Sequence, residues 1–360
     1  MNMPPDMLWT ALLACAAVML DRLLGEPRRA HPLVGFGRYA NWLEARFNPA
    51  QFNPTRFDPA RVDPARVDPA ALQALLATAQ HTVGSTATPT ASPASSARRR
   101  ARALGVAAWL LAVAPPVCVA LVLIASLPFA WACLVHVLLL WFALGARSLT
   151  QHLEPIARAL AAGDLAAARL ATARIVSRDT HAADETALAR AAVESALENG
   201  NDAIFGALFW FAIAGGPGAL AFRLANTLDA MWGYRTPRYL HFGWAAARLD
   251  DLANWVPARL TALSYAACGH SRSALACWRT QAPQWDSPNA GPVMASGAGS
   301  LQLLLGGVAR YHGRDEIRPV LGTGRPPVAD DIGRALRLVQ HSLLIWLAAL
   351  LIWGLLGHGQ

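Results

Sequence analysis

Residues 104–145 read LGVAAWLLAVAPPVCVALVLIASLPFAWACLVHVLLLWFALG and contain no Arg, Lys, Asp or Glu. A helix needs about 20 predominantly apolar residues to cross the hydrocarbon core of a bilayer, so this stretch is long enough for two crossings. A tight turn near residues 126–128 would join them, because Pro128 can begin a second helix. The stretch therefore predicts a membrane helical hairpin, and it decides the fold class.

Further apolar runs extend this interpretation. Residues 339–357 predict another membrane helix, and residues 7–20 predict a shorter one near the N-terminus. Residues 204–222 and 252–268 are weaker candidates, because a Gly-Gly-Pro-Gly sequence interrupts the first and Arg259 lies in the second. We expect an all-α, polytopic integral membrane protein with about four to six membrane-embedded helices and cytoplasmic helical segments.

The composition excludes several classes of protein. The chain is 54% hydrophobic and 15% charged, whereas an average soluble domain has about 25% charged residues. The formal net charge is +8, but there is no lysine, which excludes a Walker A phosphate loop. The aromatic residues lie in or beside apolar runs, so we expect no nucleic-acid partner. The five cysteines form no CxxC pair and are interpreted as packed thiols.

The chain is interpreted as a single membrane domain, residues 1–360, interrupted by an insert at about 48–97. Residues 47–71 repeat Asn-Pro or Asp-Pro every fifth residue, and residues 78–97 are rich in Thr, Ser and Ala. Proline cannot continue a helix, and it biases the residue before it away from helical geometry. The insert is therefore predicted to be a flexible tether without chemistry.

The distribution of arginine predicts the topology. Residues 21–103 and 146–203 are arginine-rich and flank the helical hairpin, so they lie on the same side of the membrane. The positive-inside rule makes that side the cytoplasm, and it gives the same side to residues 269–338. We expect both termini outside, and a location in the cell inner membrane with the active site on the cytoplasmic side.

Four polar clusters interrupt the apolar sequence. They are DRLLGEPRRAHPLVGFG at 21–37, the segment 177–202 beginning SRDT, the segment 223–259 beginning RLANTLDAMWGYR, and SPNAG at 287–291 together with LGTGRPPVADDIGRALR at 321–337. Taken singly, an Arg/Glu pair at a spacing of four is typical of a solvated ion pair, and a glycine-rich turn is typically only a turn. The position of all four clusters beside predicted membrane helices, however, favours a functional site over isolated surface features.

Three sets of polar residues within these clusters recur at helical spacing. They are Arg190, Glu194, Glu198 and Asp202, then Arg223, Asn226 and Asp229, and finally Asp250 and Asn254. Carboxylates at the edge of apolar helices are costly unless they pair, bind a metal or line a wet cavity. Asp and Glu oxygens suit Mg²⁺, and arginine suits phosphate. The pattern predicts a polar site near the membrane for Mg²⁺ and an anionic ligand.

In this order, the clusters resemble the CobD/CbiB family of cobalamin biosynthesis. The resemblance covers nearly the whole chain outside 48–97 and is most specific over NTLDAMWGYR at 226–235 and HFGWAAARLDDLANWVPARLTAL at 241–263. It implies an adenosylcobinamide-phosphate synthase, an ATP-dependent acid–amine ligase. Such an enzyme joins aminopropanol, or its phosphate, to a propionate carboxylate of adenosylcobyric acid. The implied cofactor is Mg²⁺, ATP is a co-substrate, and other cobalamin-assembly enzymes become candidate partners beside the lipid bilayer.

The resemblance also implies roles for individual residues. The implied metal ligands are Glu194, Glu198 and Asp202, or Asp250 and Asp251. The implied phosphate-binding residues, for ATP or the amine, are Arg178, Arg223, Arg235 and Arg248. The implied partners of the corrinoid amides are Asn199, Asn226, Asn254 and Asn289. Asp179, Glu198 or Asp229 would orient the amine or accept its proton. Two positions depart from the family pattern: Met294 stands where an acid is usual, and Ala203 where a glycine is usual.

Two other classes stay open from the sequence. A non-catalytic, AmpE-like membrane regulator would keep the polar clusters without consuming ATP, so dependence on ATP hydrolysis separates it from the synthase. A transporter would also carry carboxylates in its membrane region, but the sequence shows no inverted repeat.

Finally, ATP chemistry requires the second and third clusters on one side of the membrane. We therefore predict that residues 204–222 do not make a simple crossing.

Overall fold

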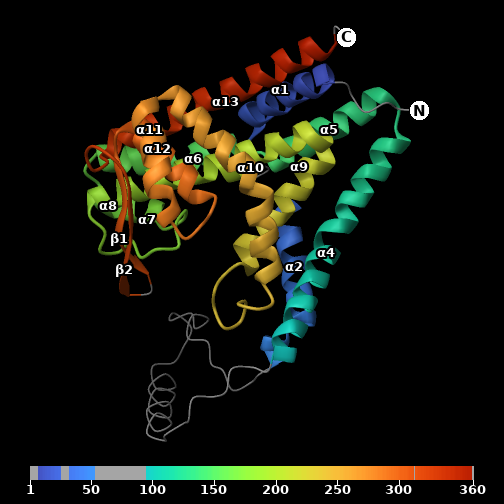
Figure 1. The fold of residues 1–360 in the computed structure, drawn as a ribbon, viewed down its shortest axis with the longest axis horizontal. Coiled ribbons are helices and arrows are strands. Elements are labelled where there is room, and N and C mark those ends of the chain that lie inside the picture. Colours follow the sequence, from blue (N-terminus) through green and yellow to red (C-terminus); the bar gives the residue numbers. More distant parts are fainter. Residues whose placement is uncertain (1–6, 26–31, 53–94, 312, 359–360) are drawn as a thin grey trace, which may run out of the picture.

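A computed structural model describes residues 7–25, 32–52, 95–311 and 313–358, and these are mostly helical (Figure 1). Most of the predicted tether and the residues 26–31 of the first polar cluster lie outside the described residues. Five helical stretches are long and apolar enough to cross a membrane: Met7–Leu24, Ser95–Ser126, Phe129–Ala161, Glu185–Trp232 and Ala329–Gly357. The predicted all-α, polytopic architecture is confirmed, with one β-hairpin added to it.

The predicted membrane hairpin is formed by α4 (Ser95–Ser126) and α5 (Phe129–Ala143). The break between the two helices falls at residues 127–128, where Pro128 immediately precedes the first turn of α5. Large apolar side chains such as Val119, Val122 and Trp131 are exposed along both helices. In a membrane, these side chains suit contact with lipid rather than with water.

Small residues let α4 pack closely on the helices beside it. Ala101, Gly105, Ala108 and Ala112 are buried along one face. A Cβ atom at Gly105 would lie 2.0 Å from the carbonyl oxygen of Phe242, so only glycine allows this approach. Helices in a membrane associate mainly through such close packing, because lipid offers no hydrophobic driving force between them.

The helix α2 (Pro32–Phe47) lies along α4 and is followed by the short 3-10 turn η1 (Pro49–Phe52). Its buried Glu44 pairs with Arg238 through both carboxylate oxygens, and Asn48 Nδ2 donates to Glu44 Oε1 at 3.0 Å. This buried ion pair ties α2 to the loop that follows α9.

The first and last helices, α1 (Met7–Leu24) and α13 (Ala329–His358), lie side by side and antiparallel (Figure 1). A Cβ atom at Gly354 would lie 2.7 Å from the Cα atom of Leu8, so the two backbones nearly touch. The buried face of α1 is built from small residues, including Ala11, Ala14 and Ala17.

The segment 252–268, a weaker candidate for a membrane helix, lies in α10 (Trp244–Cys268). This helix is not among the five apolar stretches.

The segment 204–222 forms a hairpin rather than one straight helix. From α8 (Glu185–Gly200) the chain passes through a π-helical turn, η3 (Asn201–Phe205), into α9 (Gly206–Trp232). Helical dihedral angles fail at Ala214 and Gly215, and a Cβ atom at Gly206 would lie 2.1 Å from the Phe222 ring. A straight helix would separate those two residues by about 24 Å. The chain therefore reverses, in agreement with the prediction that 204–222 is not a simple crossing.

His136 of α5 holds the reversal in place. Its Nδ1 atom accepts a hydrogen bond of 2.8 Å from the Gly216 N–H group, which places the proton of the neutral ring on Nε2. Gly215 has φ +62°, and a Cβ atom there would lie 2.6 Å from the His136 ring. The Gly-Gly sequence is therefore required both by the backbone conformation and by the close imidazole.

A hairpin of two strands, β1 (Leu304–Tyr311) and β2 (Arg314–Gly322), is antiparallel with a bulge between Gly306 and Gly307. It follows α11 (Ser271–Gln281), η4 (Ala282–Gln284) and α12 (Ala290–Leu301), and it packs against α8 and α12 (Figure 1). These strands were not predicted from the sequence. The glycines and arginines of the hairpin disrupt the alternation of apolar and polar residues that predicts a strand.

The main core joins this hairpin to the helices. Both α6 (Ala146–Ala161) and α7 (Leu165–Thr172) cover α8, which also contacts α12 and α13. Leu153, Ile156, Leu197, Phe205 and Tyr265 are fully buried there. This core fixes α8 and η3, which begin the candidate site described next.

Candidate functional site

A small cavity of about 100 Å³ collects most of the predicted carboxylates. We call it the acid pocket. Its lining residues are Glu198, Asn201, Asp202, Asp229, Asp250, Asp251, Asn254, Ser287, Asn289, Ala290 and Val293. They come from α8, η3, α9, α10 and the turn that leads into α12. The cavity therefore joins three of the four polar clusters, and no arginine is among its described lining residues.

The hairpin in α9 explains how two distant carboxylates meet. Asp202 lies in η3, at the start of the arm that leads to the reversal at Gly215, and Asp229 lies near the end of the returning helix. Both side chains line the acid pocket. The second and third polar clusters are thus on one side of the molecule, which removes the conflict raised by the sequence.

A network of amides holds Asp250 at the centre of the pocket. Asn254 Nδ2 donates to Asp250 Oδ2 at 3.2 Å, and Asn226 Nδ2 donates to Asp250 Oδ1 at 3.4 Å. The Asn254 Oδ1 atom in turn accepts from Asn201 Nδ2 at 2.9 Å, and Thr261 Oγ1 donates to Asn201 Oδ1 at 3.0 Å. The donors are neutral, so the network orients the carboxylates without neutralising them.

The electrostatics of the pocket favour a cation. Burial, and then the charges of Asp202 and Asp229, raise the pKa of Asp250 to about 8. Burial also raises the pKa of Asp251, although Arg248 and Arg235 oppose that shift. Like charges confined in a buried site either take up protons or bind a counter-ion. The pocket is therefore a site where a bound cation would release considerable electrostatic repulsion.

The donor atoms fit Mg²⁺ better than a metal with a fully protein-built cage. Among the described residues, no three His, Cys, Asp or Glu side chains are already arranged as a metal cluster. Mg²⁺ usually takes only one or two carboxylates and completes its octahedron with water and substrate phosphates. The residues that would hold it here are drawn from Asp202, Asp229, Asp250 and Asp251.

Three of the predicted phosphate-binding arginines surround the acid pocket without lining it. Arg248 Nη1 lies 3.9 Å from Asp251 Oδ2 and is largely exposed. Arg235 is exposed and close enough to Asp251 for their charges to interact. Arg223 is similarly close to Asp202. These side chains form a cationic rim that an anionic ligand would meet on its way to the carboxylates.

Asn289 of the SPNAG motif fixes the opposite wall of the acid pocket. Its Nδ2 atom donates to the Asp251 carbonyl oxygen at 2.8 Å, and its Oδ1 atom accepts from Arg259 Nη1 at 3.2 Å. Arg259 also stacks on Trp255, with its guanidinium carbon 4.2 Å from the ring centroid. Arg259 in α10 therefore supports the pocket through Asn289.

A second cavity of about 330 Å³, which we call the arginine pocket, shares Glu198 with the acid pocket. Its polar and aromatic lining residues are Ser177, Arg178, Glu194, Ser195, Glu198, Asn199, Trp285, Tyr311 and Arg318. The predicted residues Arg178 and Asn199 are therefore here rather than in the acid pocket. Met294, which replaces an acid of the family pattern, is buried in the same wall.

The structure does not support Glu194 as a metal ligand. Its carboxylate accepts from Arg178 at 2.5 Å, from both Nη atoms of Arg318 at 3.0 and 3.1 Å, and from the Gly306 N–H group at 2.8 Å. These bonds occupy both oxygens and supply two positive charges. Glu194 is therefore a buried counter-ion that fixes the β-hairpin onto α8, and it does not line the acid pocket.

Asp179 also lies away from the acid pocket. Its N–H group donates to the Arg310 carbonyl oxygen at 2.7 Å, and its Oδ2 atom accepts from the Gly313 N–H group at 2.7 Å. These bonds hold the turn of the β-hairpin, beside a separate cavity of about 230 Å³. Of the three predicted catalytic acids, the structure brings only Glu198 and Asp229 into the acid pocket.

Four contributors were missed from the sequence. Asn201 and Ser287 line the acid pocket, and both stand inside motifs already recognised, next to Asp202 and in SPNAG. Arg318 stands in a strand that was not foreseen, and His136 lies in an uncharged apolar helix. Neither has a local sequence signal, because each acts through a contact with a residue far along the chain.

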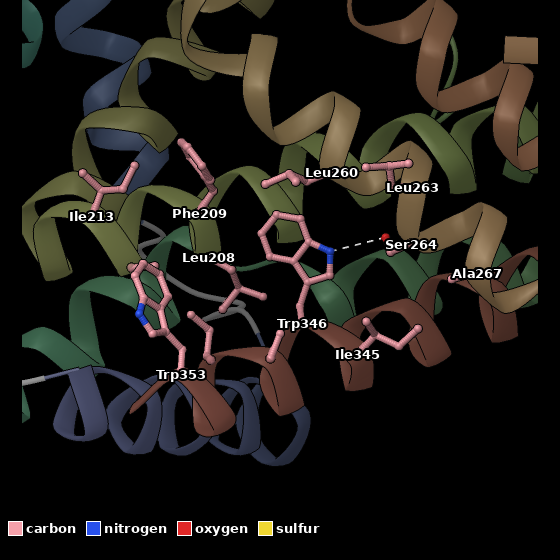
Figure 2. A pocket seen from close by; sticks show the side chains of 13 residues that line it. Leu208, Phe209, Ile213, Leu260, Leu263, Ser264, Ala267, Ile345, Trp346 and Trp353 are labelled. Atoms are coloured by element: carbon pink, nitrogen blue, oxygen red, sulfur yellow. Dashed lines mark hydrogen bonds between the residues drawn. The ribbon is translucent and has the colours of Figure 1, made fainter. Parts of the chain in front are cut away.

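A further cavity, of about 610 Å³, is apolar and carries no charged side chain among its described lining residues. Figure 2 shows it between α9, α10 and α13, with Leu208 and Ile213, Leu260 and Leu263, and Ile345 and Trp353 turned toward it. Its one polar contact there joins Trp346 Nε1 to Ser264 Oγ at 3.3 Å. It offers apolar surface but no group that could take part in acid–base or metal chemistry.

Comparison with known proteins identifies the family of the chain. The family model described as CobD/Cbib protein matches residues 14–339. A protein of Chromobacterium violaceum named cobalamin biosynthesis protein CobD is 50% identical over 339 residues, covering 94% of this chain and 95% of the relative. A protein of Stutzerimonas stutzeri with the same name is 49% identical over 343 residues, covering 95% and 97%. No solved structure matches. The chain belongs to the CobD/CbiB family.

Proposed function

We propose that this protein catalyses an amide-forming step of cobalamin biosynthesis, in which ATP drives the joining of aminopropanol, or its phosphate, to a propionate carboxylate of adenosylcobyric acid. Membership of the family, whose curated relatives are named for cobalamin biosynthesis, supports the pathway. The observation that supports the chemistry is the acid pocket with its neighbouring arginines. An unassisted carboxylate and amine do not condense at neutral pH, so the carboxylate must first be activated.

The proposed reaction has two steps. A carboxylate oxygen of the corrinoid attacks the terminal phosphorus of ATP, which gives an acyl phosphate and ADP. The amine nitrogen then attacks the acyl carbon, the C–O bond to phosphate breaks, and inorganic phosphate leaves as the amide forms. The amine loses one proton in this step. Both steps develop negative charge on phosphoryl oxygens, and catalysis therefore depends on cations and on positioning.

The residues of the chain divide these tasks. Asp202, Asp229, Asp250 and Asp251 would hold Mg²⁺, which when bound neutralises charge on the transferred phosphoryl group. The rim residues Arg223, Arg235 and Arg248 attract the anionic co-substrate. Glu198, which lines both pockets, accepts the proton that the amine loses. Asn199, Asn226, Asn254 and Asn289 supply neutral donors and acceptors that suit the uncharged amides of a corrinoid.

The test uses membranes that contain the protein, supplied with adenosylcobyric acid, Mg²⁺, ATP and either aminopropanol or aminopropanol phosphate. The corrinoid product is followed by mass. We expect an ATP-dependent amide product that falls at least about tenfold in Glu198→Gln, since a positioned base contributes about that much or more. Glu154→Gln, which removes an exposed carboxylate of α6, should match the wild type. Absence of product with both amines, from folded protein, would refute the synthase and favour the AmpE-like regulator.

A further inference from the structure

Two guanidinium groups lie together in the arginine pocket. Arg178 and Arg318 both donate to one carboxylate, Glu194, and Glu198 of the same cavity lies close enough for its charge to interact with both. Two guanidinium groups carry ten N–H bonds between them, and one carboxylate cannot accept them all. The Arg318 Nε atom is buried and has no hydrogen-bond partner among the described residues. Buried donors of this kind need a partner that the protein itself does not supply.

The geometry of these arginines is fixed from several elements. Arg178 stands in the loop before α8, whereas Arg318 stands on β2 and lies over Trp285, with its guanidinium carbon 5.6 Å from the ring centroid. The side chains of Arg178 and Arg318 are only 12% and 15% exposed. The remaining exposure opens into the 330 Å³ cavity. Arginines held in this way lose little freedom on binding a ligand, which favours recognition of a planar or tetrahedral anion.

The opposite end of the cavity carries the opposite charge. Glu198 lines the arginine pocket and also lines the acid pocket. A ligand anchored at the arginines would therefore extend toward the carboxylates that would hold Mg²⁺. A purely structural ion cluster requires no such cavity, as the Asp331 cluster at the start of α13 shows: Asp331 is fully buried between Arg325, Arg334 and the Val328 N–H group.

We propose that Arg178 and Arg318, supported by Glu194 and Trp285, form a phosphate-binding site that anchors a phosphorylated substrate next to the acid pocket. This makes Arg318, on the β-hairpin, a substrate-binding residue. The identity of the ligand rests on the proposed function, whereas the presence of a phosphate site rests on the charges and the cavity alone. Two sources share the required chemistry: the terminal phosphates of ATP and the phosphomonoester of a phosphorylated amine.

The experiment measures ligand binding by calorimetry on the full-length protein in detergent, without Mg²⁺, so that the acid pocket contributes little. The ligands are a non-hydrolysable ATP analogue, aminopropanol phosphate, and aminopropanol as the phosphate-free control. Arg318→Gln should weaken binding of the phosphorylated ligand by about tenfold or more, because a charge-assisted hydrogen bond is lost. Arg314→Gln removes the same charge from an exposed position of the same hairpin and should bind as the wild type does.

The two phosphorylated ligands distinguish the source of the phosphate. A loss confined to the ATP analogue assigns the site to the nucleotide, and a loss confined to aminopropanol phosphate assigns it to the amine. Wild-type affinity in Arg318→Gln for both ligands would overturn the proposal. So would equal binding of aminopropanol and its phosphate together with no binding of the ATP analogue.

Loss of Arg318 also removes a partner of Glu194, so Arg318→Lys provides a variant that keeps this charge pair. Lysine cannot reproduce the planar fork of N–H donors, so we expect weaker phosphate binding and a near-normal melting temperature. If Arg318→Gln does not fold, unchanged binding in Arg318→Lys overturns the proposal.

The amide assay tests the proposed function separately. Phosphate binding without amide product refutes only the synthase, and amide product with unaltered Arg318→Gln binding refutes only the phosphate site.

Discussion

The two neighbouring pockets treat their buried carboxylates in opposite ways. In the arginine pocket, Glu194 meets two guanidinium groups and a backbone N–H group. In the acid pocket, Asp250 meets only the amides of Asn226 and Asn254 and lies near other carboxylates. Paired charge stabilises the fold, whereas unpaired charge of one sign destabilises it until a cation binds. The difference separates the acid that supports the structure from the acids that we propose as ligands of a cation.

The largest expected effect is on the paired side of this comparison. Glu194→Gln would leave two mostly buried arginines facing a neutral amide, and removing one partner of a buried ion pair typically costs about 3–5 kcal/mol. The free energy of unfolding, measured by denaturant titration in detergent, should fall by about that amount. Glu154→Gln, at an exposed position, should change it by less than about 0.5 kcal/mol. If Glu194→Gln were as stable as the wild type, Glu194 would not support the fold, and the proposed difference between the two pockets would be wrong.

The matching change on the unpaired side is Asp250→Asn. In the metal-free protein Asp250 takes up a proton below about pH 8, and asparagine replaces that neutral carboxyl with a neutral amide of the same shape, so the melting temperature should stay the same or rise a little. The rate of amide formation should nevertheless fall by roughly a hundredfold, since electrostatic groups at a reacting centre contribute about that much. A strong loss of stability in Asp250→Asn, without loss of activity, would show that this acid is structural after all.

Added Mg²⁺ should affect the stability of the wild type and of Asp250→Asn differently. Added Mg²⁺ should stabilise the wild type by about 2.7 kcal/mol at a concentration of one hundred times its dissociation constant, and should stabilise Asp250→Asn much less. Because the pKa of Asp250 is raised to about 8, its carboxyl group carries a proton below that pH, and Mg²⁺ must displace it. The apparent affinity should therefore rise between pH 6 and about 8 and then level off. A pH-independent affinity would contradict this.

The smallest expected effect concerns the α9 hairpin, which brings Asp202 and Asp229 together. His136→Leu would leave the buried Gly216 N–H group without its acceptor, a loss of about 1–3 kcal/mol in the free energy of unfolding. The affinity for Mg²⁺ should fall with it, because the spacing of the two aspartates depends on the hairpin. His341→Leu, at an exposed position of α13, provides the control. If His136→Leu were destabilised but bound Mg²⁺ with unchanged affinity, the hairpin would not determine the geometry of the acid pocket.

The sequence predicted those features that are local in the chain. The span of α4 and α5, with its break at residues 127–128, follows from an uncharged run and one proline. The acid-pocket residues Asp202, Asp229, Asp250 and Asn254 follow from helical spacing beside apolar helices. Glu194 shares that spacing, yet its contacts differ, because its partner Arg318 comes from 124 residues later. The position of Asp179 away from the acid pocket has the same origin: its partners at Arg310 and Gly313 lie in a hairpin that the sequence did not reveal.

The reversal at Gly215 has a consequence for engineering the protein. Asp202 and Asp229 lie at the two ends of an apolar hairpin, so the segment that would dip into the bilayer also sets the spacing of two carboxylates of the acid pocket. Deleting the hydrophobic helices to obtain a water-soluble protein would therefore remove the scaffold of the acid pocket as well. The apolar hairpin is a structural component of the acid pocket and cannot be treated as a detachable tether.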